Sequence, residues 1–275
     1  MTAACSPGSR PSGDATSDPV AFDDLLTGLS PRERVRLQET FAAFPRGVVR
    51  ALEVGFNDFR VTRALLRVAD VVSIDLPRPV IGSPRGASLA FSNIRAVPFA
   101  DASFDLVVCT EVLEHLDDST LRAGVAELHR VSRRFVLVTV PCRQRVDNEL
   151  FKCSRCGHEE NCMGHLREIA EADLTAWFPG WQVVALREIG TIEGYAPRWL
   201  YVVSRQIGSV WFDYWTDQCP NCGARGSRAA DNAIGRLLRR VIWRLVARAA
   251  PRAAWLLALF EKRDIGALDR PHLSD

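Results

Sequence analysis

The stretch ALEVGFNDFRVTRALL, residues 51–66, has the pattern of a strand, a tight turn and a helix. A short apolar run ends in Glu53 and Gly55, and a helical pattern starts a few residues later. Turns of this kind are usually glycine-rich in nucleotide-binding domains, because the backbone must approach the ligand closely. Here Gly55 is followed by Phe56, Asn57, Asp58 and Phe59, so the turn is a candidate binding loop of unusual composition.

Short apolar segments and helical segments alternate on both sides of this stretch. We expect strands at residues 48–55, 71–76, 87–94, 104–113 and 134–141, and helices at residues 30–44, 61–69 and 121–132. The first helix has a capping box, with Ser30 as its cap, Pro31 at its first position and Glu33 completing the box. This alternation predicts an α/β fold with a doubly wound, Rossmann-like parallel sheet.

The pattern changes after Pro141. The segment 142–166 is polar and rich in Cys and His, as an inserted lobe would be, and residues 195–230 carry a second cysteine pair. We expect a helix at 171–178, a strand at 181–189, a basic helix within 231–250 and a last strand at 254–263. The segment from Pro197 could be a strand or a helix, and its spacing favours a helix. The predicted organisation is a flexible lead (1–22), a core (23–190), one lobe built from 142–166 and 195–230, a helix and last strand (231–263) and a tail (264–275).

Composition indicates a soluble globular protein. The chain has 275 residues, 47% hydrophobic and 25% charged, with a net charge of +2 that argues neither for nor against a nucleic-acid partner. It has neither a signal-peptide pattern nor a run of about 18 apolar residues. We therefore expect a cytoplasmic protein, in which paired cysteines indicate metal or redox chemistry more than disulfides.

The most specific segment is AVPFADASFDLVVCTEVLEHL, residues 96–116. Together with the loop at Glu53 and Gly55 and with Asp75, an acidic residue 20 positions after Gly55, it resembles the class I S-adenosylmethionine-dependent methyltransferases, especially the type 11-like subgroup. The resemblance covers roughly residues 45–190. It implies a seven-stranded sheet whose last strand is antiparallel, with S-adenosylmethionine at the carboxyl ends of the first strands.

The resemblance also assigns roles to residues. Glu53 and Gly55 would support and line the cofactor loop, and Asp75 would accept hydrogen bonds from both ribose hydroxyls. Asn93 would accept a bond from the adenine amino group, and Ile94 would pack on the adenine ring. Cys109 and Thr110 would flank the methionyl part of the cofactor.

Two positions of the loop depart from the pattern of these methyltransferases. Asn57 stands at the usual second glycine, where asparagine is the non-glycine residue that best tolerates a positive φ. Phe59 replaces the third glycine, and its ring must find room beside the sheet or the ligand. The cofactor has no pyrophosphate, so dense backbone donation is less essential than in a dinucleotide site, and a working loop is the favoured interpretation.

His165 and His115 are the candidate catalytic residues. His165, in the segment GHLRE, stands where relatives often carry a histidine near the acceptor, whereas His115 follows the fourth expected strand. Each also has a structural interpretation, as a packed and hydrogen-bonded imidazole. Methyl transfer from a sulfonium needs a base only if the acceptor must lose a proton.

Four cysteines form two matching CxxCG motifs, Cys153 with Cys156 and Cys219 with Cys222, separated by 62 residues. Each motif can direct two thiolates at one ion, so together they predict a tetrahedral structural Zn2+ site. The alternatives are a local site of Cys153, Cys156, Cys162 and His165, and a redox CxxC pair. Some methyltransferases of this subgroup carry similar zinc-knuckle insertions, which would shape a lid beside the acceptor pocket.

The basic segment at 231–250 repeats apolar residues at helical spacing, with arginines at most other positions. The favoured interpretation packs the apolar face on the protein. The alternative is peripheral contact with the inner face of an anionic membrane, with the arginines reaching the head groups.

The sequence therefore predicts a methyltransferase that acts on a small-molecule, glycan or lipid-linked acceptor, with oxygen as the favoured methylated atom. The alternative is a catalytically inactive binding or scaffold protein that keeps the fold and the zinc site. A nucleic-acid methyltransferase is disfavoured by the near-neutral charge.

Overall fold

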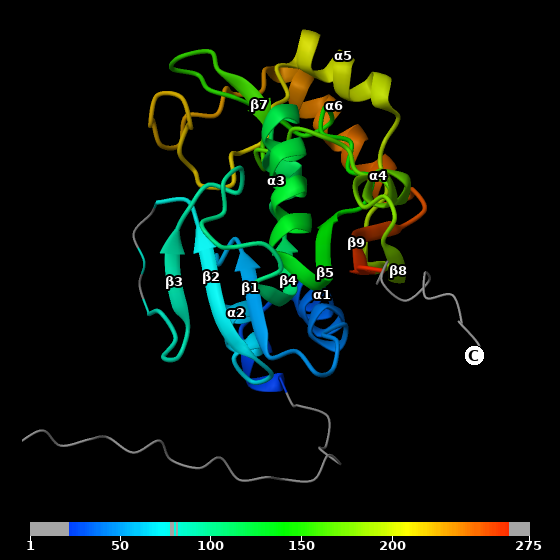
Figure 1. Cartoon of the computed structure of the whole chain (residues 1–275). Coiled ribbons are helices and arrows are strands. Elements are labelled where there is room, and N and C mark those ends of the chain that lie inside the picture. Colours follow the sequence, from blue (N-terminus) through cyan, green and yellow to red (C-terminus); the bar gives the residue numbers. More distant parts are fainter. Residues whose placement is uncertain (1–21, 78–79, 81, 264–275) are drawn as a thin grey trace, which may run out of the picture.

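The computed structural model describes residues 22–77, 80 and 82–263 (Figure 1). The predicted tail, and the predicted lead apart from Phe22, lie outside the described residues. The strands are β1 (Arg50–Val54), β2 (Asp70–Asp75), β3 (Ser88–Phe91), β4 (Phe104–Thr110), β5 (Ser132–Pro141), β6 (Leu150–Lys152), β7 (Glu159–Asn161), β8 (Gln182–Ile192) and β9 (Arg252–Glu261). The α-helices are α1 (Pro31–Ala42), α2 (Arg60–Leu65), α3 (Asp118–Val131), α4 (Glu171–Trp177), α5 (Arg198–Gly208) and α6 (Ala233–Val246), with short 3-10 turns at Asp23–Leu26 and Leu113–His115.

Seven strands form the main sheet in the order β3-β2-β1-β4-β5-β9-β8. The pairs from β3 to β5 are parallel, whereas β9 runs antiparallel to both β5 and β8. The predicted Rossmann-like sheet with an antiparallel last strand is thus confirmed. Its central strands are apolar almost throughout, and β4 is buried at all seven positions, as expected for a strand covered on both faces.

Helices cover both faces of the sheet (Figure 1). On one face, α3 and α4 pack Leu121, Leu128 and Leu174 against the sheet. On the other face, α1 and α2 contribute Phe41 and Leu65. Each buried apolar side chain of this size stabilises the fold by about 1.5–3 kcal/mol before entropy is counted.

The first helix follows its local signals. Ser30 Oγ accepts a hydrogen bond from the Glu33 backbone N–H at 3.3 Å, and the Glu33 carboxylate accepts the Ser30 N–H at 3.2 Å. The predicted capping box is therefore present, with Pro31 at the first helical position.

The helix predicted from Pro197 is also present, but it ends at Gly208, where Ser209 turns left-handed at φ 52°. Val210 and Trp211 consequently follow the helix instead of extending its apolar stripe.

Two segments of the chain between β5 and β9, one before α4 and one after β8, build a lobe at the carboxyl ends of the parallel strands (Figure 1). It contains the β6-β7 hairpin, α5 and α6. The two helices touch through glycines, since a Cβ on Gly235 would lie 1.9 Å from the Gly208 carbonyl oxygen. The favoured packing of the basic helix is observed, because Ile242 and Val246 are buried against Leu200 and Tyr201.

Candidate active site and cysteine cluster

The loop after β1 makes a close turn at Gly55. This residue has φ 87°, and its N–H donates to the Ile74 carbonyl oxygen at 2.8 Å. A Cβ at this position would lie 2.6 Å from Cγ2 of Val112, in the segment after β4. Only glycine therefore fits both the conformation and the space. The turn brings the first loop against the most specific segment of the sequence.

The left-handed residue further along the loop is Phe59 and not Asn57. Phe59 caps α2 with φ 60°, whereas Asn57 is absent from the described residues with positive φ. The expectation that Asn57 replaces a glycine through its backbone tolerance was therefore wrong. Phenylalanine keeps a conformation that costs roughly 1–2 kcal/mol for an L-residue.

Ring packing holds Phe59 in this conformation. Its ring stacks on that of Phe56, with centroids 5.2 Å apart and planes 10° apart, and Phe56 is fully buried. The Phe56 ring also lies 6.4 Å from Phe91, at the end of β3. Burial of two rings offsets the backbone cost. The aromatic rings lie inside, and Asn57 and Asp58 form the exposed part of the loop.

The buried side chain of Glu53, in β1, anchors this loop through hydrogen bonds. It is 1% exposed, and its carboxylate accepts hydrogen bonds from Thr62 at 2.5 Å and Ser73 at 2.6 Å. These contacts join β1 to α2 and to β2. Burial raises the pKa of Glu53 to about 7, against the lowering effect of the two hydroxyls.

The predicted ribose and adenine residues lie at the same edge of the sheet. Asp75 ends β2 and is in register with Phe91 of β3, so Asn93 follows two residues beyond that pair. Asn93 is exposed, and its side-chain oxygen accepts the Arg95 N–H at 2.9 Å. Ile94 is buried against Gly124 of α3. The placement at the carboxyl ends fits a bound cofactor, and the individual roles stay predictions.

Cys109 and Thr110 end β4, the strand next to β1. Cys109 is fully buried, and burial raises the pKa of its thiol far above the usual range. Thr110 is 7% exposed. In register, Cys109 faces Val54 of β1 on one side and Val138 of β5 on the other. Both residues thus adjoin the loop that begins at Gly55.

His115 and His165 lie side by side. Their rings meet edge to face with centroids 4.7 Å apart. His115 Nδ1 lies 3.1 Å from the Gly164 carbonyl oxygen, and His165 Nδ1 is bound to the side-chain oxygen of Gln144. Burial lowers the pKa of both imidazoles, that of His165 to about 4, with the nearby His115 adding to the effect. Both rings are therefore neutral at physiological pH.

Glu111 and Glu114, in the segment after β4 that contains His115, were not among the predicted site residues. Glu111 has φ 56°, and its carboxylate accepts hydrogen bonds from Trp255 Nε1 at 2.8 Å and Thr139 at 3.3 Å. Glu114 is 1% exposed, and burial raises its pKa well above the usual value, with the Glu111 charge adding to it. Their spacing beside His115, in EVLEH, is the sequence signal that could have drawn attention to them.

A cavity of about 410 Å³ lies beside these residues. Glu111, His165 and Gln144 line one side of it, and the lobe contributes Tyr201, Ile242 and Val246. Further lining residues are Glu149, Tyr195, Arg252 and Trp255. None of the predicted cofactor residues lines this cavity. Through Glu111 it adjoins the segment that follows β4.

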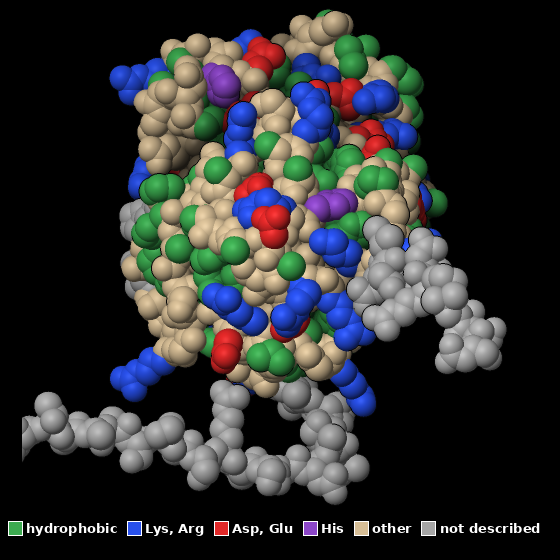
Figure 2. Space-filling view, in the orientation of Figure 1, with side chains coloured by type: hydrophobic (Ala, Val, Ile, Leu, Met, Phe, Trp, Pro, Cys, Tyr) green, Lys and Arg blue, Asp and Glu red, His purple; other side chains and the backbone are tan. Residues whose placement is uncertain are grey.

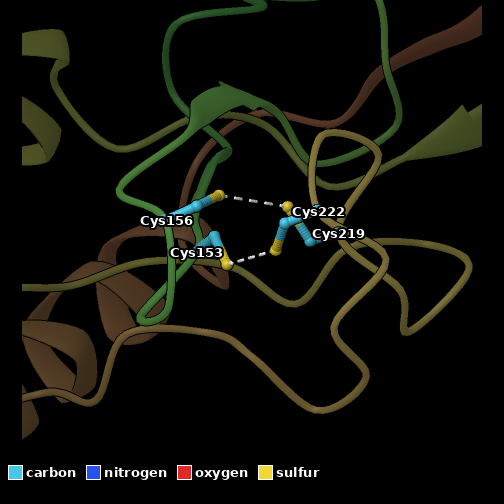
Figure 3. Close-up of side chains that lie close together, drawn as sticks. All are labelled: Cys153, Cys156, Cys219 and Cys222. Atoms are coloured by element: carbon cyan, nitrogen blue, oxygen red, sulfur yellow. Dashed lines mark hydrogen bonds between the residues drawn. The ribbon is translucent and has the colours of Figure 1, made fainter.

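Four sulfur atoms converge in the lobe (Figure 3). Cys153 Sγ lies 3.7 Å from Cys222 Sγ, and Cys156 Sγ lies 3.7 Å from Cys219 Sγ. All four sulfurs lie within 4.8 Å of one another. Backbone pairing holds the two segments together, since Cys153 bridges to Arg228. The two CxxCG motifs thus meet, despite their separation in sequence, in a cluster that could hold one metal ion.

The alternative local site is not assembled. In the part of the chain that the structure describes, the metal-competent group around Cys153 contains neither Cys162 nor His165. Cys162 is buried against Phe151, and burial raises the pKa of its thiol to about 12. His165 instead joins His115 and Glu114 in a second group.

Comparisons with known proteins identify the domain and the fold that this chain resembles. Residues 52–135 match a family described as "Methyltransferase domain". A Haloferax volcanii structure, a complex of the Trm112 methyltransferase activator with a methyltransferase, is 13% identical, with a TM-score of 0.50 over 89% of this chain and 99% of that one. No curated protein has significant sequence similarity to the chain.

Two further solved structures are similar. A Bacillus halodurans methyltransferase is 14% identical, with a TM-score of 0.49, and the match covers 82% of this chain and 97% of the other. The Burkholderia thailandensis 1,6-didemethyltoxoflavin-N1-methyltransferase, with S-adenosylhomocysteine bound, is 13% identical, with a TM-score of 0.45 over 82% of this chain and 76% of that one. Residues 52–135 therefore match a methyltransferase domain, and the chain as a whole has the fold of the class I S-adenosylmethionine-dependent methyltransferases.

Proposed function

We propose that the protein transfers a methyl group from S-adenosylmethionine to a hydroxyl oxygen of a small-molecule, glycan or lipid-linked acceptor. The observation that carries this proposal is the cavity beside Glu111 and His165, at the carboxyl edge of the sheet. When bound, the cofactor supplies a methyl group on a positively charged sulfur, which a nucleophile displaces.

The protein's own contribution is to position the two reactants. Gly55 and Asp75 lie on the side of β1 and β2, and the cavity lies on the side of β5, β8 and β9. A methyl donor on the first side and an acceptor on the second would meet beside Thr110, at the end of β4. Alignment of this kind supplies much of the acceleration of a direct displacement.

The acceptor class follows from the lining of the cavity. Tyr201, Ile242 and Val246 offer an apolar wall, and Glu149 and Arg252 offer polar contacts. A molecule with an apolar body and a hydroxyl-bearing head matches this combination. A lipid-linked sugar or a phenolic compound of moderate size meets both requirements.

The first test is a calorimetric titration of the folded, metal-loaded protein with S-adenosylmethionine and S-adenosylhomocysteine. Micromolar binding supports the proposal, and transfer of a labelled methyl group to a panel of phenols and lipid-linked sugars then identifies the acceptor. Absence of binding to both compounds would instead favour the inactive binding protein, in which the Phe56 and Phe59 rings mark a closed pocket.

We further propose that the cysteine cluster binds structural Zn2+. A tetrahedral ion with zinc–sulfur bonds of about 2.3 Å places its sulfurs roughly 3.8 Å apart. The sulfur pairs Cys153–Cys222 and Cys156–Cys219, each 3.7 Å apart, match that edge length. Four thiolates leave no open position, so the ion would fix the two segments of the lobe and take no part in methyl transfer.

Peripheral membrane contact is a second proposal, favoured by the outer surface of α5 and α6. Trp199, Leu237 and Trp243 are each more than half exposed, and Arg240 and Arg244 of α6 are exposed as well. No helix among the described residues is long and apolar enough to cross a bilayer. On the α3 side, basic and acidic side chains are mixed over the surface (Figure 2).

Sedimentation with anionic vesicles tests this contact. Wild-type protein should sediment with vesicles, and Leu237→Asp should remain in the supernatant, because an exposed substitution removes the apolar contact without unfolding the lobe. Asp substitution of Val49, which is 64% exposed at the opposite edge of the sheet, is the matched control. Equal sedimentation of the Leu237 variant and the wild type would disprove this surface as the contact.

A further inference from the structure

The buried carboxylate of Glu114 is the starting point. The side chain is 1% exposed, and within the described part of the chain neither of its oxygens has a hydrogen-bond partner. A buried carboxylate without partners is costly, and native proteins rarely keep one without a ligand, an ion or a water to satisfy it. The 3-10 turn Leu113–His115 holds it in this position, and the Glu114 carbonyl oxygen accepts the Leu166 N–H at 2.8 Å.

The two neighbouring histidines are oriented as metal ligands are. A carbonyl oxygen can only accept, so the contact of His115 Nδ1 with Gly164 O requires that Nδ1 carry the proton. The contact of His165 Nδ1 with the Gln144 side-chain oxygen has the same consequence. Each ring therefore keeps a lone pair on Nε2. In metal sites, a hydrogen bond from the other ring nitrogen fixes the tautomer and orientation of the metal-bound histidine.

The three side chains converge. One ligand atom each from Glu114, His115 and His165 can be chosen so that all lie within 4.8 Å of one another. This spacing is close enough for three atoms to surround one ion with only small side-chain adjustments. Glu111 lies next to this group of three ligands but does not belong to it, because its carboxylate accepts hydrogen bonds from Trp255 and Thr139. Its charge adds to the negative potential around the group.

We propose that Glu114, His115 and His165 form a second metal site, which binds a divalent first-row transition ion and is distinct from the cysteine cluster. Two imidazoles and one carboxylate suit Zn2+, Fe2+, Co2+ or Mn2+, and three protein ligands leave open coordination positions. The cysteine cluster offers four thiolates, which select zinc and leave no such position. The two groups therefore differ in both ligand type and accessibility.

The open positions would face the acceptor, since His165 also lines the cavity. A role of the ion in activating the acceptor rests on the proposed function. A hydroxyl oxygen bound to the ion loses its proton to solvent more readily, because a divalent ion lowers the pKa of a bound hydroxyl. The oxygen then forms a bond to the methyl carbon as the carbon–sulfur bond breaks, and the sulfonium becomes a neutral thioether.

The experiment measures metal binding directly, without an acceptor. Protein carrying zinc in the cysteine cluster is titrated with Mn2+, and free Mn2+ is followed by electron paramagnetic resonance. Wild-type protein should bind one Mn2+ per chain in addition to its zinc. Glu114→Gln and His165→Asn should weaken that binding at least tenfold. His129→Asn is the matched control, because His129 also bonds a carbonyl oxygen, that of Trp177, outside the group.

Cobalt gives the second measurement. Co2+ in the Glu114 site should produce weak visible bands without thiolate charge transfer, and these bands should survive Cys219→Ser. If wild-type protein bound neither Mn2+ nor Co2+ beyond the cysteine cluster, the proposal would be overturned. Unchanged binding by Glu114→Gln and by His115→Asn, whose side chain is partly exposed, would overturn it equally. Calorimetry with S-adenosylmethionine on the same samples shows separately whether the methyltransferase proposal fails.

Discussion

The rings of His115 and His165 meet edge to face at 4.7 Å, although one follows β4 of the sheet and the other follows the β6-β7 hairpin of the lobe. Neighbouring contacts strengthen this junction. Arg167 donates to the Leu116 carbonyl oxygen and to Asp118. The lobe is therefore attached to the end of the strand at which methyl transfer is proposed. Any distortion of the lobe should reach the acceptor side of the site.

Removal of the Asp75 carboxylate should weaken cofactor binding. A carboxylate that accepts both ribose hydroxyls contributes charged hydrogen bonds of about 1.5–3 kcal/mol each, so Asp75→Ala should lower the affinity for S-adenosylhomocysteine by at least about tenfold. Asp70→Ala, at the exposed start of the same strand, is the control. The measurement is calorimetry on folded protein. Equal affinity in the wild type and the Asp75 variant would refute this placement of the ribose.

The left-handed backbone at Phe59 makes a separate prediction about stability. Phe59→Gly and Phe59→Ala both remove the ring that stacks on Phe56, so both should be destabilised. Because φ is 60°, the glycine variant should be the more stable of the two by about 1 kcal/mol. Urea unfolding followed by circular dichroism compares them. An alanine variant as stable as the glycine variant would mean that the loop is not left-handed in solution.

Loss of one thiolate should empty the cysteine cluster. Cys219→Ser leaves three sulfurs for an ion that needs four, and we expect about one zinc per chain in the wild type and almost none in this cluster in the variant. Thiolate-to-cobalt absorption of the cobalt-substituted protein reports this cluster alone. Cys162→Ser should keep the signal, because Cys162 lies outside the cluster. The reverse result, with the signal lost only in the Cys162 variant, would restore the local site of Cys153, Cys156, Cys162 and His165.

Much of the core could be predicted because its signals are local. Alternating strands and helices, the Ser30 cap and the segment 96–116 each depend on residues close in sequence. The meeting of the two CxxCG motifs was predictable as well, since a shared ion requires four ligands. Gly55 was singled out as part of a loop that approaches a ligand, which stays a prediction, and its φ of 87° and the contact with Val112 are further reasons for a glycine there.

Other features depended on contacts that no local pattern contains. The left-handed residue is Phe59 and not Asn57, because ring stacking on Phe56 offsets a backbone cost that intrinsic preference assigns to asparagine. The group of Glu114, His115 and His165 needed the lobe to fold back on the sheet. From the sequence, His115 and His165 were considered separately, as bases or packed residues, with His165 also a ligand of the alternative cysteine site. The sequence could not show that the buried Glu114 lies beside both rings.

Protonation of Glu53 should make the stability of the protein depend on pH. Its pKa is raised from 4.5 to about 7 in the folded protein, so the folded state holds this proton more tightly than the unfolded chain. The contribution is fully present below about pH 4.5 and is lost as the pH rises through about 7, with a total of about 3 kcal/mol. Glu53→Gln resembles the protonated acid at every pH and lacks this dependence. Over pH 4.5–8, the free energy of unfolding of the wild type should therefore fall relative to that of the variant, as measured by urea denaturation at each pH. A constant difference between the two proteins across this range would show that Glu53 keeps an ordinary pKa and that Thr62 and Ser73 stabilise its charge fully.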